Sequence, residues 1–292
     1  MAIKNKPANK TEKQTSSIFN KQIAVPSDHG SWIFIISPLL IGFFAAENWT
    51  SSNLYLLLAA SAAFLIRQPV LMMVKSYSGR RSRKDLPAAR FWFLFYGLVG
   101  LTGLYKLVQS GHGYILWLAF PGMAVFGWHL YLVRRREERH RIGVDILAGG
   151  ALSLAAPAAY WVSVGSPDPN GWWLWGLIWF QTAASIVYAF LRLEQRALKL
   201  SPSQEEKWKM GRRGLFYAGF NLITVLMASI LGWLPTWVWL AYGVQFIEVL
   251  WGIQNPAIGV KPTRIGIRQL IVSSLFTIVF IFTWQIGGSV RI

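Results

Sequence analysis

The sequence predicts an all-α, polytopic membrane protein: a bundle of about nine transmembrane helices with its N-terminus in the cytoplasm and its C-terminus outside. Two observations support this fold class. The 292-residue chain is 54% hydrophobic and only 14% charged, with a mean hydropathy of +0.38, which leaves too little polar surface to cover a soluble globule. In addition, its Lys and Arg residues gather in five clusters that are separated by pairs of apolar segments.

Nine apolar segments are candidates for membrane spans. A helix needs about 20 apolar residues to cross ~30 Å of hydrocarbon, and a helix satisfies its backbone hydrogen bonds internally. The second span is interrupted by Arg67-Gln68-Pro69, where Pro69 removes one backbone donor and favours a kink. The predicted spans are residues 31–46, 53–74, 90–107, 114–133, 143–162, 171–191, 214–231, 232–253 and 265–286.

The basic clusters predict the orientation of these spans. They lie before the first span, between the second and third, the fourth and fifth, the sixth and seventh, and at the start of the ninth. Only Arg67, Lys106 and Arg291 lie outside the clusters, whereas Glu47 and Asp168 add acidic groups to the opposite loops. Because basic loops stay in the cytoplasm, the pattern places the N-terminus inside and requires an odd number of spans.

A tail and one domain follow from this reading. Residues 1–24, rich in Lys, Asn, Ser and Thr, are predicted to form a disordered basic cytoplasmic tail, and residues 25–292 a single transmembrane domain. The net charge of +17 would suggest nucleic acid as the partner of a soluble protein, but clusters at every second loop indicate membrane orientation instead. We therefore expect membrane lipids as partners and no nucleic acid; the sequence does not predict the oligomeric state.

Common soluble-enzyme motifs are missing from the sequence. The chain has no cysteine, which excludes thiolate catalysis and cysteine-ligated metal sites. His129, in the fourth predicted span, stands alone without metal-ligand spacing, and the chain contains neither a phosphate-binding loop nor a G-x-S-x-G pattern. The sequence therefore predicts no metal site and no cofactor.

Charged residues inside the predicted spans are the first functional candidates, because a charge in hydrocarbon costs several kcal/mol. Arg67 either extends to the cytoplasmic head groups or, with Gln68, binds an anion at a broken helix. Glu248 and Gln245 share one face of the eighth span, three residues apart. Glu248 is a catalytic candidate, and the alternative is a structural ion pair with a basic residue such as Arg67.

Two further groups lie near the predicted cytoplasmic face. Asp28 and His29 precede the first span; they either cap that helix or serve as acid/base or anion contacts, since histidine titrates near neutrality. Tyr188, Arg192 and Arg196 are spaced by four residues and form one helical stripe at the end of the sixth span. They either anchor the span or contact phosphate oxygens, which arginine forks suit.

Four stretches together resemble the YwiC-like family of bacterial integral membrane proteins. They are the sequence PSDHGSW at 26–32, the Arg67-Gln68-Pro69 step, the tract 185–196, and the sequence KPTRIGIRQ at 261–269. The resemblance covers nearly the whole chain after about residue 24 and implies an integral protein of a bacterial inner membrane or a thylakoid-type membrane. It implies no activity, because the family has none established.

The arrangement of spans also resembles, more weakly, the UbiA superfamily of intramembrane prenyltransferases. In that superfamily the loops after the second and sixth spans carry Asp-rich motifs that hold Mg²⁺ and a prenyl diphosphate. Here those loops contain only Asp85, Glu194, Glu205 and Glu206 among many basic residues. The departure puts metal-assisted chemistry in doubt, because several carboxylates are needed to hold Mg²⁺ against a diphosphate.

Three functions remain open from the sequence. The first is a UbiA-like membrane enzyme or a binder of an isoprenoid-, quinone- or lipid-like molecule, with an anionic head group at the cytoplasmic face. The predicted ligand-binding residues are then Arg67, Gln68, Tyr188, Arg192, Arg196 and Gln245. The alternatives are a small-molecule transporter, because prolines interrupt several spans and Arg67, Glu248 and His129 lie inside predicted spans, and a membrane scaffold or assembly factor.

Overall fold

The protein is a bundle of long helices. The computed structural model describes residues 21–26, 32–137 and 142–287, and every regular element in these ranges is a helix. The predicted all-α fold class is therefore confirmed. The helices are α1 (Lys21–Ala24), α2 (Ile33–Ala46), α3 (Ser51–Tyr77), η2 (Arg83–Asp85), α4 (Leu86–Gln109), α5 (Ile115–Arg135), α6 (Ile142–Ser153), α7 (Ala155–Val164), α8 (Pro169–Arg196), α9 (Gln204–Ile230), α10 (Trp239–Gln254) and α11 (Pro262–Ile286).

Seven helical segments in the described residues are long and apolar enough to cross a membrane, which makes the chain an integral membrane protein. They are α3, α4 with η2, α5, α6 with α7, α8, α9 and α11. With 14 and 16 residues, α2 and α10 are shorter. At 1.5 Å per residue, α2 is only about 21 Å long. Each of the nine predicted spans coincides with one of these segments, while the count of nine membrane crossings remains a prediction.

Several helix boundaries differ from the predicted spans. Helix α9 begins at Gln204, ten residues before the predicted seventh span, because Ser203 and Glu206 form a capping box that starts the helix in a polar segment. Helix α10 begins at Trp239, seven residues after the start of the predicted eighth span. The predicted fifth span is divided at Leu154 into α6 and α7. Pro157, in the first turn of α7, has no N–H and so cannot donate the backbone hydrogen bond that would continue α6 into α7. The helix boundaries depend on backbone hydrogen bonds, which the hydropathy of a segment does not report.

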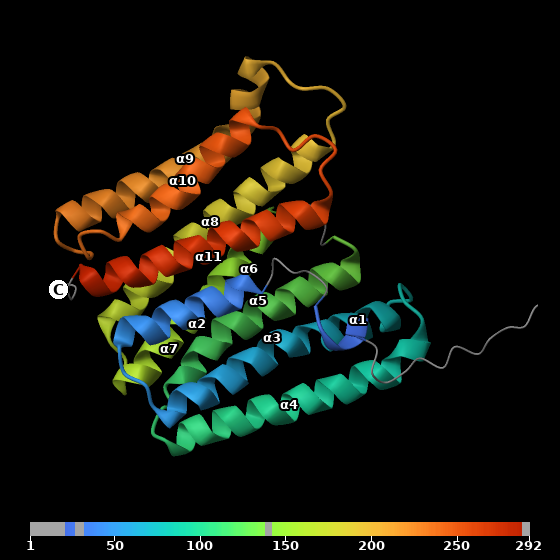
Figure 1. The fold of residues 1–292 in the computed structure, drawn as a ribbon. Coiled ribbons are helices and arrows are strands. Elements are labelled where there is room, and N and C mark those ends of the chain that lie inside the picture. Colours follow the sequence, from blue (N-terminus) through green and yellow to red (C-terminus); the bar gives the residue numbers. More distant parts are fainter. Residues whose placement is uncertain (1–20, 27–31, 138–141, 288–292) are drawn as a thin grey trace, which may run out of the picture.

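The basic segments lie at one end of the bundle. In Figure 1 the α3–α4, α8–α9 and α10–α11 connections lie at the right-hand end, whereas the α2–α3, α4–α5 and α9–α10 connections lie at the left. We call the first end the basic end and the second the opposite end. The basic end is the one that the sequence predicts to be cytoplasmic; the orientation itself remains a prediction.

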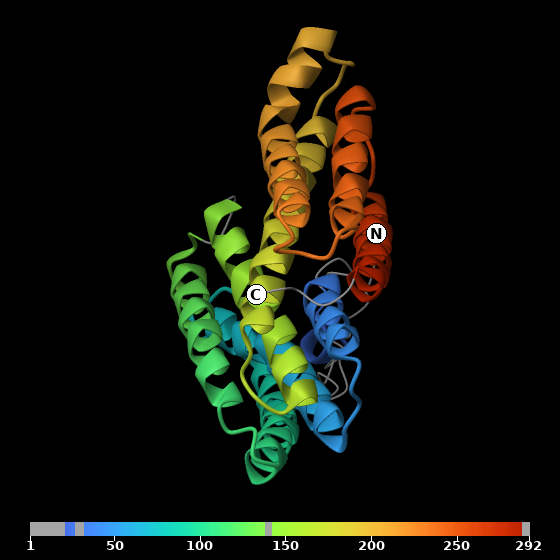
Figure 2. The ribbon, with the colours of Figure 1, turned by 90° about the vertical axis from the view of Figure 1, so that its left-hand side faces the viewer.

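Helix α2 occupies a central position and packs against α3, α6, α7, α8 and α11. The contact with α7 is close, since a Cβ at Gly42 would overlap the carbonyl oxygen of Ala156. Figure 2 shows α9, α10 and α11 on one side of the bundle and α3, α4 and α5 on the other, with α8 running between them. The largest buried apolar cluster joins α2, α8, α9, α10 and α11 around Phe276, Phe280 and Tyr242.

Part of the predicted N-terminal tail is helical. Residues 21–24 form α1, and Ile23 is fully buried in a cluster with Met72, Ala88 and Ala89. Tyr96 donates a hydrogen bond from its hydroxyl to the Ala24 carbonyl oxygen at 2.9 Å. Residues 1–20 of the predicted tail lie outside the described residues. The segment just before the first span is thus held between α3 and α4.

Candidate functional site

A stripe of polar side chains runs along the buried face of α8. Gln181, Ser185, Tyr188, Arg192 and Gln195 recur at intervals of three and four residues, and each of them is buried. This spacing places all five on one side of the helix. Buried polar groups require partners, so the stripe marks where α8 meets polar groups of other helices. Those helices are α10 and α11.

Glu248 and Arg268 form an ion pair between α10 and α11. Arg268 Nε donates to Glu248 Oε1 at 2.6 Å, and Arg268 Nη2 donates to Oε2 at 2.8 Å, which makes the pair bidentate. The Tyr188 hydroxyl on α8 adds a third bond to Glu248 Oε1 at 2.8 Å. The Arg268 guanidinium also lies 3.5 Å from the centroid of the Trp251 ring. Three helices are therefore joined at one carboxylate.

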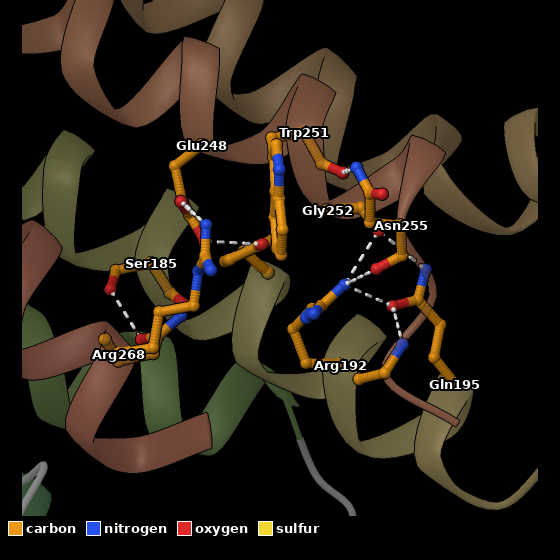
Figure 3. A network of polar contacts seen from close by, with 11 residues as sticks. Ser185, Arg192, Gln195, Glu248, Trp251, Gly252, Asn255 and Arg268 are labelled. Carbon is orange, nitrogen blue, oxygen red and sulfur yellow. Dashed lines mark hydrogen bonds and ion pairs between the residues drawn. The ribbon is translucent and has the colours of Figure 1, made fainter. Parts of the chain in front are cut away.

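Arg192 lies on the other face of Trp251 and closes the end of α10. Figure 3 shows the indole between the two arginines, and the Arg192 guanidinium is 5.4 Å from its centroid. Arg192 Nη1 donates to the carbonyl oxygens of Gly252 at 2.8 Å and Asn255 at 2.7 Å, and to Gln195 Oε1 at 2.9 Å. The last carbonyls of a helix lack internal donors and carry partial negative charge. Arg192 satisfies two carbonyls at the end of α10 with a buried cation.

Replacing Arg192 with Leu is expected to lower the free energy of unfolding by about 3 kcal/mol, because three acceptors, two of them in buried hydrogen bonds, would lose their shared donor. Arg196→Leu is the matched control: Arg196 lies four residues later, is exposed, and within the described part of the chain its side chain donates to the Val260 carbonyl alone, at 3.2 Å. We expect a loss below about 1 kcal/mol for the control. Thermal unfolding in detergent measures both, and equal losses would contradict this role of Arg192.

The inner part of the stripe contacts α10 and α11 through uncharged groups. Gln181 Nε2 donates to Gln245 Oε1 at 3.0 Å, and Ser185 Oγ lies 3.0 Å from Gln269 Oε1. Gln181 Oε1 and Gln245 Nε2 are buried and have no hydrogen-bond partner among the described residues. Gln181 and Ser185 also line a cavity of about 20 Å³ between α2, α8 and α11, which has room for about one water molecule.

The structure brings together four of the predicted site residues. Tyr188, Arg192, Gln245 and Glu248 belong to the stripe and its partners. The partner of Glu248 is Arg268, and not Arg67 as the sequence suggested, because α11 places Arg268 directly opposite the carboxylate. Arg196 lies one turn after Arg192 at the end of α8, beyond the buried stripe. Its side chain is exposed and donates to the Val260 carbonyl.

The other predicted residues lie elsewhere or outside the described ranges. The Arg67 guanidinium lies 5.1 Å from the centroid of the Phe64 ring on α3. Gln68 Nε2 donates to the Gln22 carbonyl on α1 at 2.9 Å, which fixes the N-terminal segment. Asp28 and His29 lie outside the described residues, so their predicted role stays a prediction. Sequence reasoning missed Arg268, Gln181, Gln195 and Trp251 as site residues, although the repeat on α8 contains the signal for Gln181 and Gln195.

Two of the four acidic groups in the loops that would correspond to UbiA motifs have other partners. Asp85 Oδ2 accepts from Arg81 Nε at 2.6 Å, and Glu206 Oε2 accepts from the Ser203 N–H of its own capping box at 2.8 Å. Among the described residues no three His, Asp or Glu side chains lie together as metal ligands would. These residues do not fit the Mg²⁺ site that the UbiA resemblance implies.

Comparison with known proteins gives one family. Residues 25–160 match the family model described as YwiC-like protein. The chain is 22% identical over 223 residues to the uncharacterized protein YwiC of Bacillus subtilis (strain 168), an alignment that covers 72% of this chain and 84% of that protein. No solved structure matches. These matches confirm the resemblance predicted from the sequence, and the network on α8, α10 and α11 lies beyond the residues that the family model covers.

Proposed function

We propose that this YwiC-like integral membrane protein binds a hydrophobic, isoprenoid-, quinone- or lipid-like molecule through its anionic head group, at the basic ends of α8, α10 and α11. The observation that carries the proposal is Arg268. Its side chain is 41% exposed, although Glu248 and Trp251 hold its guanidinium in place. A fixed arginine that is open on one side is a built anion site rather than a mobile surface charge.

The hydrogen-bonding capacity of Arg268 supports the proposal. A guanidinium carries five N–H groups in a planar fork. The bidentate pair with Glu248 uses Nε and one Nη2 hydrogen, so three N–H groups remain for a ligand. Phosphate and carboxylate oxygens match this geometry, and the planar stack on Trp251 limits the rotamer freedom that a ligand would otherwise have to remove.

The charge balance of the network points to the same class of ligand. Arg192 and Arg268 carry two positive charges against the single carboxylate of Glu248, and Arg192 is compensated by carbonyl oxygens rather than by an acid. Lys261 and Arg264 add exposed positive charge at the start of α11. Each Lys or Arg near the membrane surface contributes about 1 kcal/mol to the attraction of anionic head groups.

Binding has more support than the alternatives. A UbiA-like transfer reaction would need carboxylates for Mg²⁺, and Asp85 and Glu206 are engaged elsewhere. A transporter would need space for a solute along the inner part of the stripe. The cavity beside Gln181 has a volume of about 20 Å³, which accommodates one water molecule and not a larger solute. We therefore place the ligand at the open side of Arg268 and its tail along the membrane.

The test uses farnesyl diphosphate and farnesol as a charged and a neutral probe with the same tail. We expect the purified protein to bind farnesyl diphosphate at least about tenfold more tightly than farnesol, since hydrogen bonds to charged groups contribute about 1.5–3 kcal/mol. The decisive variant is Glu248→Gln/Arg268→Gln, which removes the fork but leaves the network with the same net charge, because one positive and one negative group are lost together.

We expect the double variant to lose the preference for the diphosphate, whereas Arg83→Gln keeps it. Arg83 is an exposed cation between α3 and α4, so its replacement removes a charge at the basic end without touching the network. Equal binding of the two probes to the native protein would overturn the proposal. Unchanged diphosphate binding by the double variant would overturn the assignment to Arg268.

A further inference from the structure

The cavity of about 20 Å³ between α2, α8 and α11 has a polar lining. Its polar side chains are Gln181 and four that carry hydroxyl groups, Ser37, Thr182, Ser185 and Ser273, and all five are buried. Buried polar groups in proteins are almost always hydrogen-bonded, either to the protein or to ordered water. A space that gathers five of them inside a membrane bundle is therefore a candidate binding site.

The backbone of α2 is interrupted where it borders this cavity. Pro38 lies inside α2 and is one of the lining residues. Proline has no N–H, so the carbonyl oxygen of Phe34, four residues earlier, lacks the donor that a regular helix would give it. Phe34 also lines the cavity. The turn of α2 that lacks a hydrogen bond therefore lies against the cavity.

Gln181 supplies a second acceptor without a donor. Its Nε2 donates to Gln245 Oε1 on α10 at 3.0 Å, whereas its Oε1 is buried and has no hydrogen-bond partner among the described residues. Gln181 is only 5% exposed, so bulk water does not reach this oxygen. Leaving a buried acceptor unpaired is unfavourable, and a donor inside the cavity would remove that penalty.

The hydroxyl hydrogens of two lining serines are already engaged. A hydroxyl group carries one hydrogen. Thr277 Oγ1 donates its hydrogen to the Ser273 carbonyl oxygen at 2.8 Å, so the 2.6 Å contact between Ser37 and Thr277 uses the Ser37 hydrogen. Ser185 Oγ donates to Gln269 Oε1 at 3.0 Å. Ser37 and Ser185 therefore offer the cavity lone pairs and not hydrogens.

This lining favours a small, neutral hydrogen-bond donor. An anion would need donors, and the Phe34 carbonyl, Gln181 Oε1 and the two serine oxygens are acceptors. Among the described residues that line the cavity there is no Asp or Glu, so a cation would have no compensating charge. A buried water molecule needs about 10–15 Å³ and about two to four polar partners, and the cavity provides both.

We infer that this cavity binds one ordered water molecule, which donates to Gln181 Oε1 and to the Phe34 carbonyl oxygen. The water replaces the hydrogen bond that Pro38 removes from α2, and it joins α2 to α8 inside the bundle. Through the bond between Gln181 and Gln245 the same contacts reach α10. The inference does not rest on the proposed function, because the ion pair of Arg268 lies outside the lining of the cavity.

Radiolytic oxidation of the purified protein in detergent tests the inference at two phenylalanines of α11. An X-ray pulse converts water into hydroxyl radicals, which oxidise the aromatic rings that the water contacts, and mass spectrometry of peptides locates the product. Phe276 lines the cavity and is 1% exposed, whereas Phe280 is fully buried and is not a lining residue. We expect oxidation of Phe276 and none above background at Phe280. An unoxidised Phe276, or equal oxidation of the two rings, would overturn the inference.

Two variants of α11 locate the water. Ser273→Val replaces a lining hydroxyl with a methyl group and adds a second methyl group, which fills the space of the water. We expect this variant to lose the oxidation of Phe276. Ser274→Val is the matched control, because Ser274 is the next residue of α11 and does not line the cavity; it should be oxidised like the native protein. Continued oxidation of Phe276 in Ser273→Val, or its loss in Ser274→Val, would contradict the assignment.

A density map of the native protein that resolves ordered water gives a second measurement, which does not depend on the folding of a variant. We expect one peak in the cavity, within hydrogen-bonding distance of Gln181 Oε1 and of the Phe34 carbonyl oxygen. A map that shows ordered water elsewhere in the protein but no peak at this position would overturn the inference.

Discussion

Replacing Arg268 with Gln is expected to lower the free energy of unfolding by about 3 kcal/mol, because it leaves the Glu248 carboxylate without its charged partner. The Glu248 side chain is only 9% exposed, so water does not replace the lost bonds. Among the described residues, the Tyr188 hydroxyl is then the remaining hydrogen-bond partner of that carboxylate, at 2.8 Å. One neutral hydrogen bond does not compensate for the loss of a buried bidentate pair.

The double variant Glu248→Gln/Arg268→Gln is the internal control for this result. It removes both charges, so no ion is left unpaired, and we expect its stability within about 1 kcal/mol of the native protein. Thermal unfolding of the native protein, both single variants and the double variant gives the coupling energy between the two residues. A double variant as unstable as Arg268→Gln would show that the loss comes from packing on Trp251 and not from the unpaired carboxylate.

Gly252→Ala is expected to be the most damaging small substitution in the network, with a loss of about 2–3 kcal/mol. A Cβ at this position would overlap the Tyr188 hydroxyl, which must then move away from Glu248. The Gly252 carbonyl also accepts from Arg192 at 2.8 Å and from Gln195 at 3.1 Å. A shift of the backbone here would therefore disturb both arginine sites at once.

The matched control for this substitution is Gly243→Ala on the same helix. An added Cβ at Gly243 meets nothing within 4 Å, and alanine is the better helix former by about 1 kcal/mol. We expect the control to be neutral or slightly stabilising in the same unfolding measurement. If Gly252→Ala proves as stable as Gly243→Ala, the close approach of α10 to Tyr188 does not hold the network together.

The helical fold was predictable because hydropathy depends on residues that are close in sequence. Every predicted span coincides with a helix or, for 143–162, with the pair α6 and α7. The errors lie where hydrogen bonding and hydropathy disagree: α9 extends into the polar segment that starts at its capping box, and Pro157 divides a continuous apolar run. Neither effect changes the apolar content of the segment.

The candidate site was predictable only along single helices. The spacing of Tyr188 and Arg192 indicates a shared face, and extending the same repeat to Gln181, Ser185 and Gln195 would have found the whole stripe. The partner of Glu248 was not predictable, because Arg67 and Arg268 are equally basic and only the arrangement of α3, α10 and α11 in space selects Arg268. In the sequence, Arg268 belongs to the basic cluster at the start of the ninth predicted span, and such clusters indicate which end of a span faces the cytoplasm.

Native mass spectrometry of the purified protein and of Glu248→Gln/Arg268→Gln tests the central claim most directly. The account predicts that the native protein retains a hydrophobic molecule with a phosphate or carboxylate head group, and that the double variant, expected to be equally stable, loses it. Retention of the same molecule in equal amount by both proteins, or release of no anionic molecule by the native protein, would contradict the claim that Arg268 is an anion site in the membrane.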